Sequence, residues 1–279
     1  TEDMDLSYRA QLSGWQFVYL PELSAPAELP VDMISFKSQQ FRWAKGSVQT
    51  ARKLLGPIAR APVERKIKSE AFFHLTNNVA YGFLLLLALL QLPNMLLRRK
   101  LDTPELLLLD VPLFLATCGS IALFYLTAHH ALYGNVWGAL KRLPLMMALG
   151  IGLAVNNSRA TLEGLFGDGV EFVRTPKRGL VDGASVRRTS TYRSRLPWHN
   201  LLEIGFGLYC GVTLLLAVLT QSWLSIPFVA LFCSGFIYVG TAGLFEALKD
   251  RLAQGTEAAE PATQLPSSHR SPSAQSIAS

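Results

Sequence analysis

The chain is poor in charged residues and in cysteine. Asp, Glu, Lys and Arg make up only 16% of its 279 residues. The three cysteines, Cys118, Cys210 and Cys233, have no paired spacing and no cluster of His or carboxylate ligands nearby, which argues against a disulfide scaffold and against a zinc site. No nucleic-acid-binding motif is visible, and the basic residues lie beside apolar segments, so we expect no nucleic-acid partner.

Half of the residues are hydrophobic, and they are gathered into blocks rather than spread as a soluble core requires. A membrane-spanning helix needs about 20 predominantly apolar residues. Four windows are long enough to supply one, and the sequence therefore predicts four membrane-spanning helices, at residues 72–97, 106–132, 201–219 and 223–248.

A fifth apolar run, residues 143–153, is too short to cross a membrane comfortably and continues into polar Asn156 and Asn157. We interpret it as a re-entrant or interfacial helix. An even number of crossings then keeps the basic segment 169–197 on the side of the N-terminal region. The four-span topology places Arg98-Arg99-Lys100 on the opposite side, against the usual charge bias. A five-span alternative, in which residues 143–165 cross, stays open, but it would place the more basic segment 169–197 on that opposite side instead.

The formal net charge of +6 is concentrated in two basic runs that flank apolar segments. Nine Lys or Arg lie within residues 37–68 against one acid, and seven lie within 174–195 against one acid. The plain interpretation of both runs is retention on the cytoplasmic side together with contact with anionic lipid.

Residues 1–69 are soluble in character. The pattern predicts a short helix at 5–12, a buried strand at 17–20 ended by Pro21, and a long helix at 31–55 ended by Gly56-Pro57. On that long helix Gln39, Arg42 and Trp43 are three and four residues apart, so they share one face.

Three motifs occur in a fixed order around the apolar blocks: Thr1-Glu2-Asp3, then Gln39-Gln40-Phe41-Arg42-Trp43, then Phe172-Val173-Arg174-Thr175-Pro176-Lys177. Together they resemble the processive glycosyltransferases of family 2, a group that includes cellulose and mannan synthases. The resemblance covers nearly all of residues 1–248 and matches the C-terminal part of such enzymes. It implies a polymerising enzyme that transfers a sugar from a nucleotide donor with inversion.

The resemblance implies that Asp3 is the base that deprotonates the acceptor hydroxyl, with Glu2 as a supporting residue. Another interpretation needs no chemistry. Thr1 caps a short helix, and the acidic residues of the first turn complement its dipole. Both interpretations use the same three residues.

By the same resemblance, Arg42 and Gln39 stabilise the departing diphosphate, and Trp43 stacks on the terminal sugar of the acceptor. The alternative is a helix beside the membrane, with Trp43 in the interfacial belt and Arg42 reaching lipid phosphates. Phe172, Thr175 and Lys177 resemble a gating loop that closes over the donor diphosphate, whereas the plain interpretation is an ordinary basic loop.

Polar residues within or beside the apolar blocks are candidates for a polymer path, because a desolvated charge needs a partner or water. They are Asp110, Asn156, Asn157, Arg159 and Glu163. The plainer interpretation places Asp110 and Arg159 at the membrane interface.

The predicted fold class is a membrane α-helical protein with a truncated α/β, Rossmann-like cytoplasmic portion. The expected organisation is an acceptor-side portion at 1–69, membrane helices with the interfacial helix at 70–168, a gating-type loop at 169–197, a membrane hairpin at 198–248, and a tail at 249–279 that is disordered from residue 253.

The chain opens directly on a motif without an initiating Met, so we expect a donor-binding half to precede it in a longer protein. That half would hold Mg²⁺ or Mn²⁺, and the partners would be UDP-glucose or GDP-mannose, the growing polysaccharide and membrane lipid. The fragment alone is expected to be inactive. The expected location is a bacterial inner membrane, with the catalytic face cytoplasmic. The alternatives are a single transfer to a lipid acceptor or a transporter without chemistry.

Overall fold

The computed structural model describes residues 1–20, 22–101, 107–167 and 198–259, and the regular elements among these are all helical. The elements in chain order are α1 (Glu2–Leu12), α2 (Met33–Arg60), α3 (Arg65–Thr76), the 3-10 turn η1 (Asn77–Val79), α4 (Ala80–Leu101), α5 (Leu107–Tyr133), α6 (Trp137–Gly152), α7 (Ala154–Phe166), α8 (Trp198–Leu219) and α9 (Ile226–Ala259).

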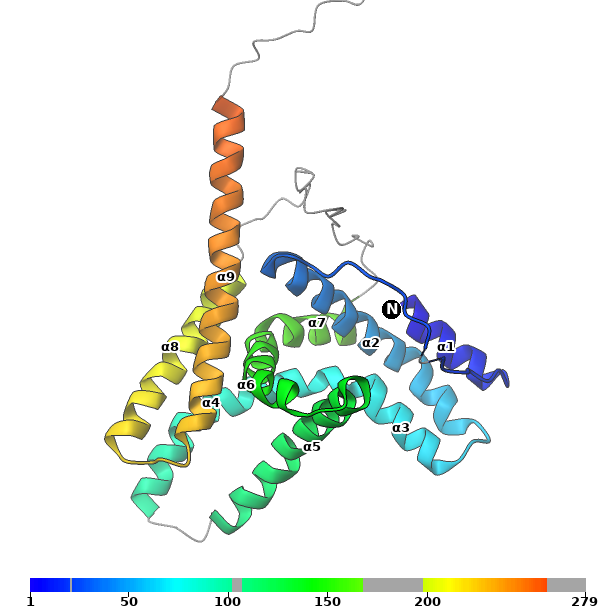
Figure 1. The fold of residues 1–279 in the computed structure, drawn as a ribbon, viewed down its shortest axis with the longest axis horizontal. Coiled ribbons are helices and arrows are strands. Elements are labelled where there is room, and N and C mark those ends of the chain that lie inside the picture. Colours follow the sequence, from blue (N-terminus) through cyan, green and yellow to red (C-terminus); the bar gives the residue numbers. More distant parts are fainter. Residues whose placement is uncertain (21, 102–106, 168–197, 260–279) are drawn as a thin grey trace, which may run out of the picture.

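The last two helices form a hairpin, and the remaining helices are arranged beside it (Figure 1). Helix α6 packs against α9, and α7 packs against α2, so α6 and α7 connect the hairpin to the N-terminal helices. Glycines permit close contact within the hairpin. A Cβ on Gly207 of α8 would overlap the side chain of Ile237 of α9.

Three stretches of described helix are long and apolar enough to cross a membrane: Arg65–Lys100, Trp198–Leu219 and Ile226–Leu252. They match three of the four predicted spans, and α5 occupies the place of the remaining one. The C-terminal end of α4 and the turn between α8 and α9 lie at the same edge of the molecule in Figure 1. The protein is therefore built as a membrane helical protein.

Helices α6 and α7 are joined at Leu153 with a bend of 48°. Together the pair is long and apolar enough for a broken span, and it has the shape that a re-entrant segment also takes. The re-entrant or interfacial helix expected here stays a prediction, because the bent pair fits a broken span equally well. The count of spans is three, or four if the bent pair is one of them, among the residues that the structure describes.

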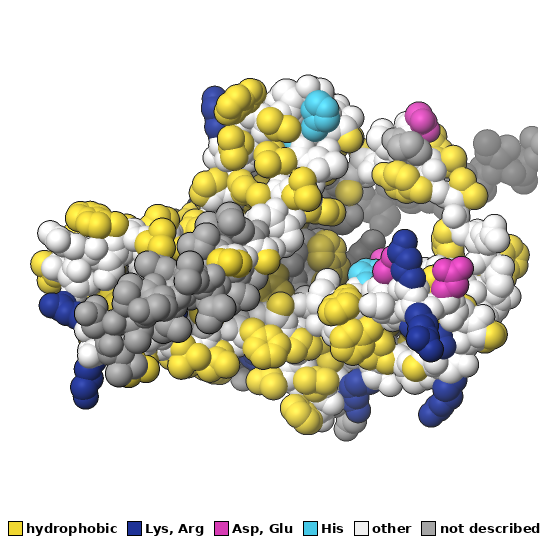
Figure 2. All heavy atoms as spheres, turned by 90° about the horizontal axis from the view of Figure 1, so that it is seen from below, with side chains coloured by type: hydrophobic (Ala, Val, Ile, Leu, Met, Phe, Trp, Pro, Cys, Tyr) yellow, Lys and Arg dark blue, Asp and Glu magenta, His cyan; other side chains and the backbone are white. Residues whose placement is uncertain are grey.

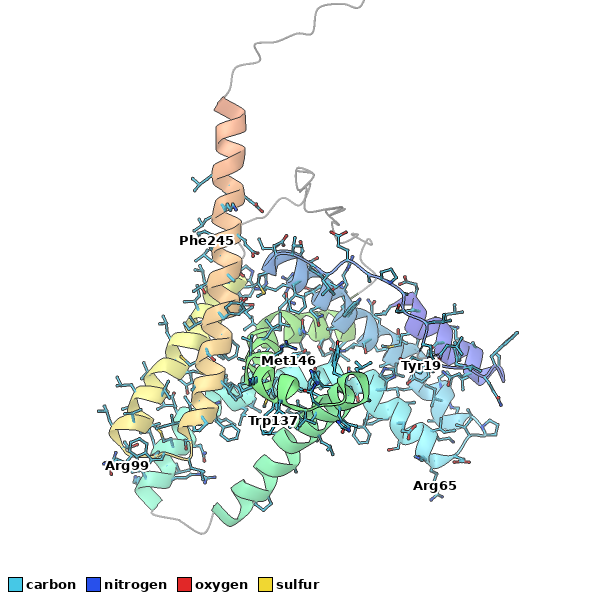
Figure 3. The ribbon with its side chains drawn as sticks, in the orientation of Figure 1. Tyr19, Arg65, Arg99, Trp137, Met146 and Phe245 are labelled. Carbon is cyan, nitrogen blue, oxygen red and sulfur yellow. The ribbon has the colours of Figure 1, made fainter. Side chains whose placement is uncertain are left out.

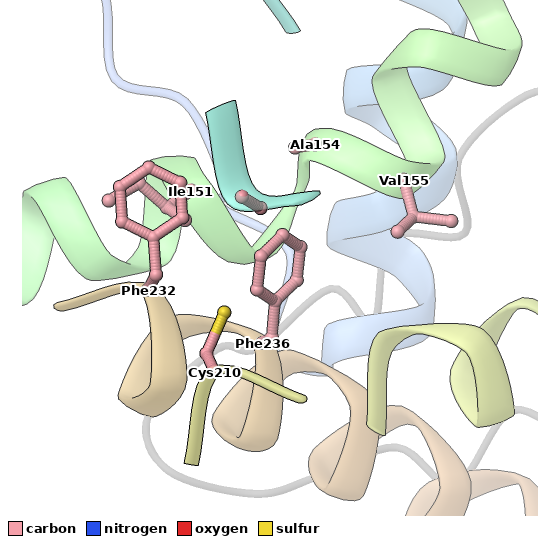
Figure 4. Packing of buried hydrophobic residues seen from close by; sticks show 7 residues of the cluster. Ile151, Ala154, Val155, Cys210, Phe232 and Phe236 are labelled. Atoms are coloured by element: carbon pink, nitrogen blue, oxygen red, sulfur yellow. The ribbon is translucent and has the colours of Figure 1, made fainter. Parts of the chain in front are cut away.

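The main hydrophobic core lies where α4, α6, α7, α8 and α9 meet. Figure 4 shows Phe232 and Phe236 of α9 directed toward Ile151 and Ala154, with Cys210 of α8 beside them. The Phe206 and Phe236 rings stack with centroids 5.2 Å apart. This core holds the bent pair against the hairpin.

Large apolar side chains also cover much of the outside (Figure 2). On α4, Phe83 is 67% exposed and Leu97 54%. Acidic side chains in that view gather at one side of the molecule. An apolar surface of this extent is stable in a lipid environment, where hydrocarbon covers it.

The expected buried strand at 17–20 is wrong. Residues 15–20 form no regular element, and Val18 and Tyr19 are 81% and 86% exposed. Figure 3 labels Tyr19 near α1. A strand requires a neighbouring strand for its backbone hydrogen bonds, and none lies among the described residues, so the α/β portion of the expected fold is not seen in them.

Three helix boundaries also differ from expectation. Helix α1 begins at Glu2 rather than at residue 5, and α9 continues to Ala259 through residues expected to be disordered. Helix α2 passes through Gly56-Pro57 to Arg60. Pro57 removes only one backbone donor there, and Leu54 and Ile58 are buried against Leu75, which carries the helix past it.

Close contact between α6 and α9 yields a stability prediction. A Cβ on Gly152 would overlap the carbonyl oxygen of Gly235, whereas a Cβ on Gly150 of the same helix would meet nothing within 4 Å. We expect Gly152→Leu to lower the melting temperature of the detergent-solubilised protein by several degrees, because overpacking costs about 1–3 kcal/mol. Gly150→Leu is the matched control, and an equal effect of both would refute the contact.

Candidate functional site

Helix α2 carries the central motif, and its N-terminus is fixed by carboxylates. The Asp32 side chain accepts a hydrogen bond from the Ser35 backbone amide at 2.7 Å. Glu246 of α9 accepts from the amides of Met33 and Ile34 at 2.9 and 3.0 Å. These carboxylates satisfy amides that a helix start leaves without partners, and they complement the helix dipole.

The motif residues lie together on one part of α2. Gln39 and Arg42 are partly buried, and Trp43 is 52% exposed. Other α2 residues form a buried face, among them Ala44, Val48, Ala51, Leu54 and Ile58. The expectation that Gln39, Arg42 and Trp43 share a helix face is confirmed by the continuous helix through these positions.

The first turn of α1 lies against α2 one turn after Arg42. A Cβ built on Gly46 would overlap the Thr1 hydroxyl, so α1 approaches α2 closely at Gly46. The pKa of the Glu2 carboxyl lies below its usual value, because it accepts a hydrogen bond from its own backbone amide, and the Arg42 guanidinium makes a smaller contribution. The first and second motifs are therefore brought together.

Asp3 lies exposed in this first turn. Its Oδ1 accepts a hydrogen bond from the Met4 amide at 2.8 Å. Thr1 occupies the N-cap position, as the cap interpretation requires, but its side chain makes no capping hydrogen bond. An exposed carboxylate at the end of a helix, beside the motif helix, is free to contact a bound hydroxyl.

The predicted gating residues Phe172, Thr175 and Lys177 lie outside the described residues, and the side chain of Asp110 is likewise not described. The helices before and after the predicted loop, however, both contact α2. Arg52 donates a hydrogen bond to the Gly164 carbonyl near the end of α7 at 3.1 Å. At the start of α8, Glu203 accepts a hydrogen bond from Lys37.

Arg159 and Glu163 of α7 form a charged network that contacts α2. Arg159 donates to Glu163 Oε1 at 2.8 Å and to His199 Nε2 at 2.6 Å, and its guanidinium lies 5.3 Å from the Phe41 ring centroid. Lys45 lies 3.2 Å from Glu163 Oε2. A place at the membrane interface therefore does not fully describe Arg159, because its side chain also contacts Phe41 of α2 and His199 of α8.

Sequence reasoning missed Lys37, Lys45, His199, Asn200 and Glu203. Lys37 and Lys45 belong to the basic run assigned to lipid contact, yet they are 7% and 8% exposed. A weak signal was present for Glu203, a single carboxylate inside a predicted span, where a charge requires a partner.

Metal ligation finds no support in this part of the protein. Within residues 1–20, 22–101, 107–167 and 198–259 no group of three His, Cys, Asp or Glu side chains is arranged to hold a metal ion. The residues present therefore do not fit the divalent cation that the resemblance implies, and its ligands would have to come from outside them.

The contact at Gly46 can be tested directly. We expect Gly46→Leu to displace the first turn of α1 and to speed amide hydrogen exchange in Glu2–Leu12, because the new side chain occupies the place of Thr1. Gly56→Leu on the same helix meets nothing within 4 Å and serves as the control. Unchanged exchange in Gly46→Leu would show that α1 does not rest on α2.

Comparison with known proteins places the motifs in context. No protein-family profile matches the chain, and no solved structure matches it. Probable glucomannan 4-beta-mannosyltransferase 10 of Arabidopsis thaliana is 28% identical over 247 residues, which are 86% of this chain and 44% of that protein. Glucomannan 4-beta-mannosyltransferase 7 of the same plant is 29% identical over 263 residues, 86% of this chain and 43% of that protein.

A rice relative gives the same result. Probable glucomannan 4-beta-mannosyltransferase 9 of Oryza sativa subsp. japonica is 30% identical over 228 residues, 75% of this chain and 40% of that protein. The chain thus spans less than half the length of these relatives. The resemblance drawn from the motifs is confirmed: this membrane helical chain is related to the cellulose synthase-like glucomannan 4-beta-mannosyltransferases of glycosyltransferase family 2.

Proposed function

We propose that this chain is the acceptor side and the membrane part of an inverting, processive β-glycosyltransferase that elongates a polysaccharide of the β-1,4-mannan or glucan type. The supporting observation is the contact of the Thr1-Glu2-Asp3 turn with the helix of Gln39, Arg42 and Trp43, in a chain related to mannosyltransferases. A base must lie near the acceptor hydroxyl, and positive charge must lie near the departing diphosphate.

In the proposed reaction the acceptor hydroxyl oxygen attacks the anomeric carbon of the donor sugar. The new glycosidic bond forms as the bond from that carbon to the diphosphate breaks, so the configuration inverts. The hydroxyl proton passes to the Asp3 carboxylate. The electron pair of the broken bond leaves with the diphosphate, whose charge the Arg42 guanidinium stabilises with a hydrogen bond from Gln39.

Trp43 supplies the acceptor surface in this proposal. Its side chain is 52% exposed on α2, so a sugar ring can stack on its indole face. Stacking holds the terminal sugar with its hydroxyl directed toward the base, which converts an intermolecular encounter into an oriented one. Phe172, Thr175 and Lys177 would close over the donor diphosphate and exclude water.

The donor-binding half is proposed to come from sequence outside these residues. The apolar segment from Trp15 to Leu20 suits that proposal, because Phe17, Val18 and Tyr19 are 64%, 81% and 86% exposed. Large side chains exposed in a row normally lie against another part of the molecule. The donor half would also supply the Mg²⁺ or Mn²⁺ ligands, and without it the fragment would be inactive.

The membrane helices are proposed to form the path through which the polymer leaves. The catalytic face would then be cytoplasmic, in a bacterial inner membrane. Similarity to glucomannan mannosyltransferases favours GDP-mannose over UDP-glucose as donor. The basic segments beside the membrane helices suit a cytoplasmic face in contact with anionic lipid.

The proposal is tested by incorporation of radiolabelled sugar in membranes that carry the chain together with its donor-binding half. GDP-mannose and UDP-glucose are each supplied with magnesium or manganese. An insoluble labelled polymer supports the synthase. Label in a lipid extract alone would indicate a single transfer to lipid, and no product from any donor, in folded and inserted protein, would favour a membrane protein without this chemistry.

Asp3→Asn is expected to abolish polymer synthesis, because the amide cannot accept the proton. Removal of a general base typically costs about 10²–10⁴-fold in rate. Donor binding, measured by titration of the nucleotide sugar, should remain nearly unchanged. Asp5→Asn is the control, since Asp5 pairs with Arg9 at 2.7 Å on the same helix. Loss of donor binding in folded Asp3→Asn would refute the assignment.

Trp43→Ala is expected to weaken use of the acceptor more than binding of the donor, because it removes the stacking face for the acceptor sugar, and aromatic contacts contribute about 0.5–1.5 kcal/mol each. The measurement is elongation rate against acceptor oligosaccharide concentration. Trp137→Ala is the matched control for Trp43→Ala, because Trp137 is also exposed, to 67%, and lies at the start of α6. An elongation rate unaltered by Trp43→Ala excludes the stacking role.

A further inference from the structure

A buried ion pair joins α2 to the membrane hairpin. Lys37 Nζ lies 2.6 Å from Glu203 Oε2 and donates to Asn200 Oδ1 at 2.8 Å. Lys37 is 7% exposed, Asn200 1% and Glu203 0%. The three side chains come from positions far apart in the sequence, and they connect the motif helix to the first turns of α8.

The hairpin closes around this cluster. A Cβ on Gly240 of α9 would approach the Glu203 Cβ to 3.0 Å, and a Cβ on Gly243 would approach the Asn200 amide nitrogen to 2.9 Å. Both glycines therefore admit the polar side chains of α8 between the two helices. Burial lowers the pKa of the Lys37 ammonium, and the Glu203 carboxylate opposes that shift.

Burial of this kind is poorly explained by stability alone. Two charges lose their hydration when they leave water, and a well-packed apolar pair of similar volume often stabilises a fold equally well or better. An ion pair adds a fixed relative placement of the two helices. Apolar helix faces can slide or rotate over one another at low cost, whereas a 2.6 Å contact between two charged groups allows one arrangement.

The cluster belongs to a set of polar contacts that all meet the first turns of α2. Glu246 of α9 binds the Met33 and Ile34 amides, and Asn156 of α7 donates to the Lys37 carbonyl at 2.9 Å. Helices α7, α8 and α9 thus all bind residues 33–37. Arg42 follows Lys37 by five residues, or about 7.5 Å along the helix.

We infer that Lys37 and Glu203 are positioning residues that fix the axial register and rotation of α2 against α8, and thereby the placement of Gln39 and Arg42. The inference rests on the proposed function for its catalytic consequence. Its geometric consequence, a single fixed placement of α2 on the hairpin, is independent of that function.

The test replaces the pair by apolar residues. Lys37→Met alone would leave Glu203 as an unpaired buried charge and is expected to fold poorly. The double variant Lys37→Met/Glu203→Leu keeps the volume and removes both charges, so it is expected to fold and insert. Lys66→Met is the control, because Lys66 pairs with Glu70 at 3.9 Å with side chains 82% and 67% exposed.

Two readouts are taken on the complete enzyme. The first is kcat and KM for GDP-mannose, or for UDP-glucose if only that donor is used. The second is the distance distribution between spin labels at Lys53→Cys on α2 and Leu219→Cys on α8, in a background with Cys118, Cys210 and Cys233 replaced by alanine. Both labelled positions are exposed.

We expect the double variant to lose about tenfold to a hundredfold in kcat, because a shift of about 1 Å in catalytic groups costs this much, with KM changed less than about twofold. The distance distribution should broaden, and the control should match wild type. Wild-type kcat and an unaltered distribution in the folded double variant would overturn the inference. If the wild-type enzyme uses no donor, the proposed function fails, and the distance distribution alone decides the inference.

Discussion

The fixed placement of α2 is the constraint on which the rest of this structure depends. Its N-terminal amides are bound by Asp32 and Glu246, and its Lys37 is buried against Glu203. Charges and helix ends removed from water are stable only with matched partners, so α8 and α9 must lie where Glu203 and Glu246 meet α2. The placement of α2 in turn fixes the positions of Gln39, Arg42 and Trp43 on the following turns.

Small residues complete the arrangement where polar contacts are absent. Gly152 and Gly235 bring α6 against α9, and Gly46 admits the first turn of α1 against α2. In a lipid environment apolar side chains gain little from burying each other, so close backbone packing and interhelical hydrogen bonds carry helix association. The two kinds of contact together connect the Thr1-Glu2-Asp3 turn to the hairpin through α2 and α7.

The sequence was most reliable where one physical requirement controls the outcome. Hydrocarbon thickness fixes the length of a spanning helix, and the apolar blocks predicted the membrane helices closely. Local signals were less reliable. Pro57 did not end α2 because buried Leu54 and Ile58 hold that turn against α3. The apolar residues 17–20 form no strand because they have no partner strand among the described residues.

The sequence by itself determined the membrane class, the three motifs in order and the common helical face of Gln39, Arg42 and Trp43, because spacing along a helix and apolar length are local properties. Only the tertiary structure decided that Thr1 rests on Gly46, that Arg159 binds His199, and that Lys37 is buried with Glu203 rather than directed to lipid. Those partners are separated by tens to more than a hundred residues, and no local pattern selects one basic residue of a run for burial.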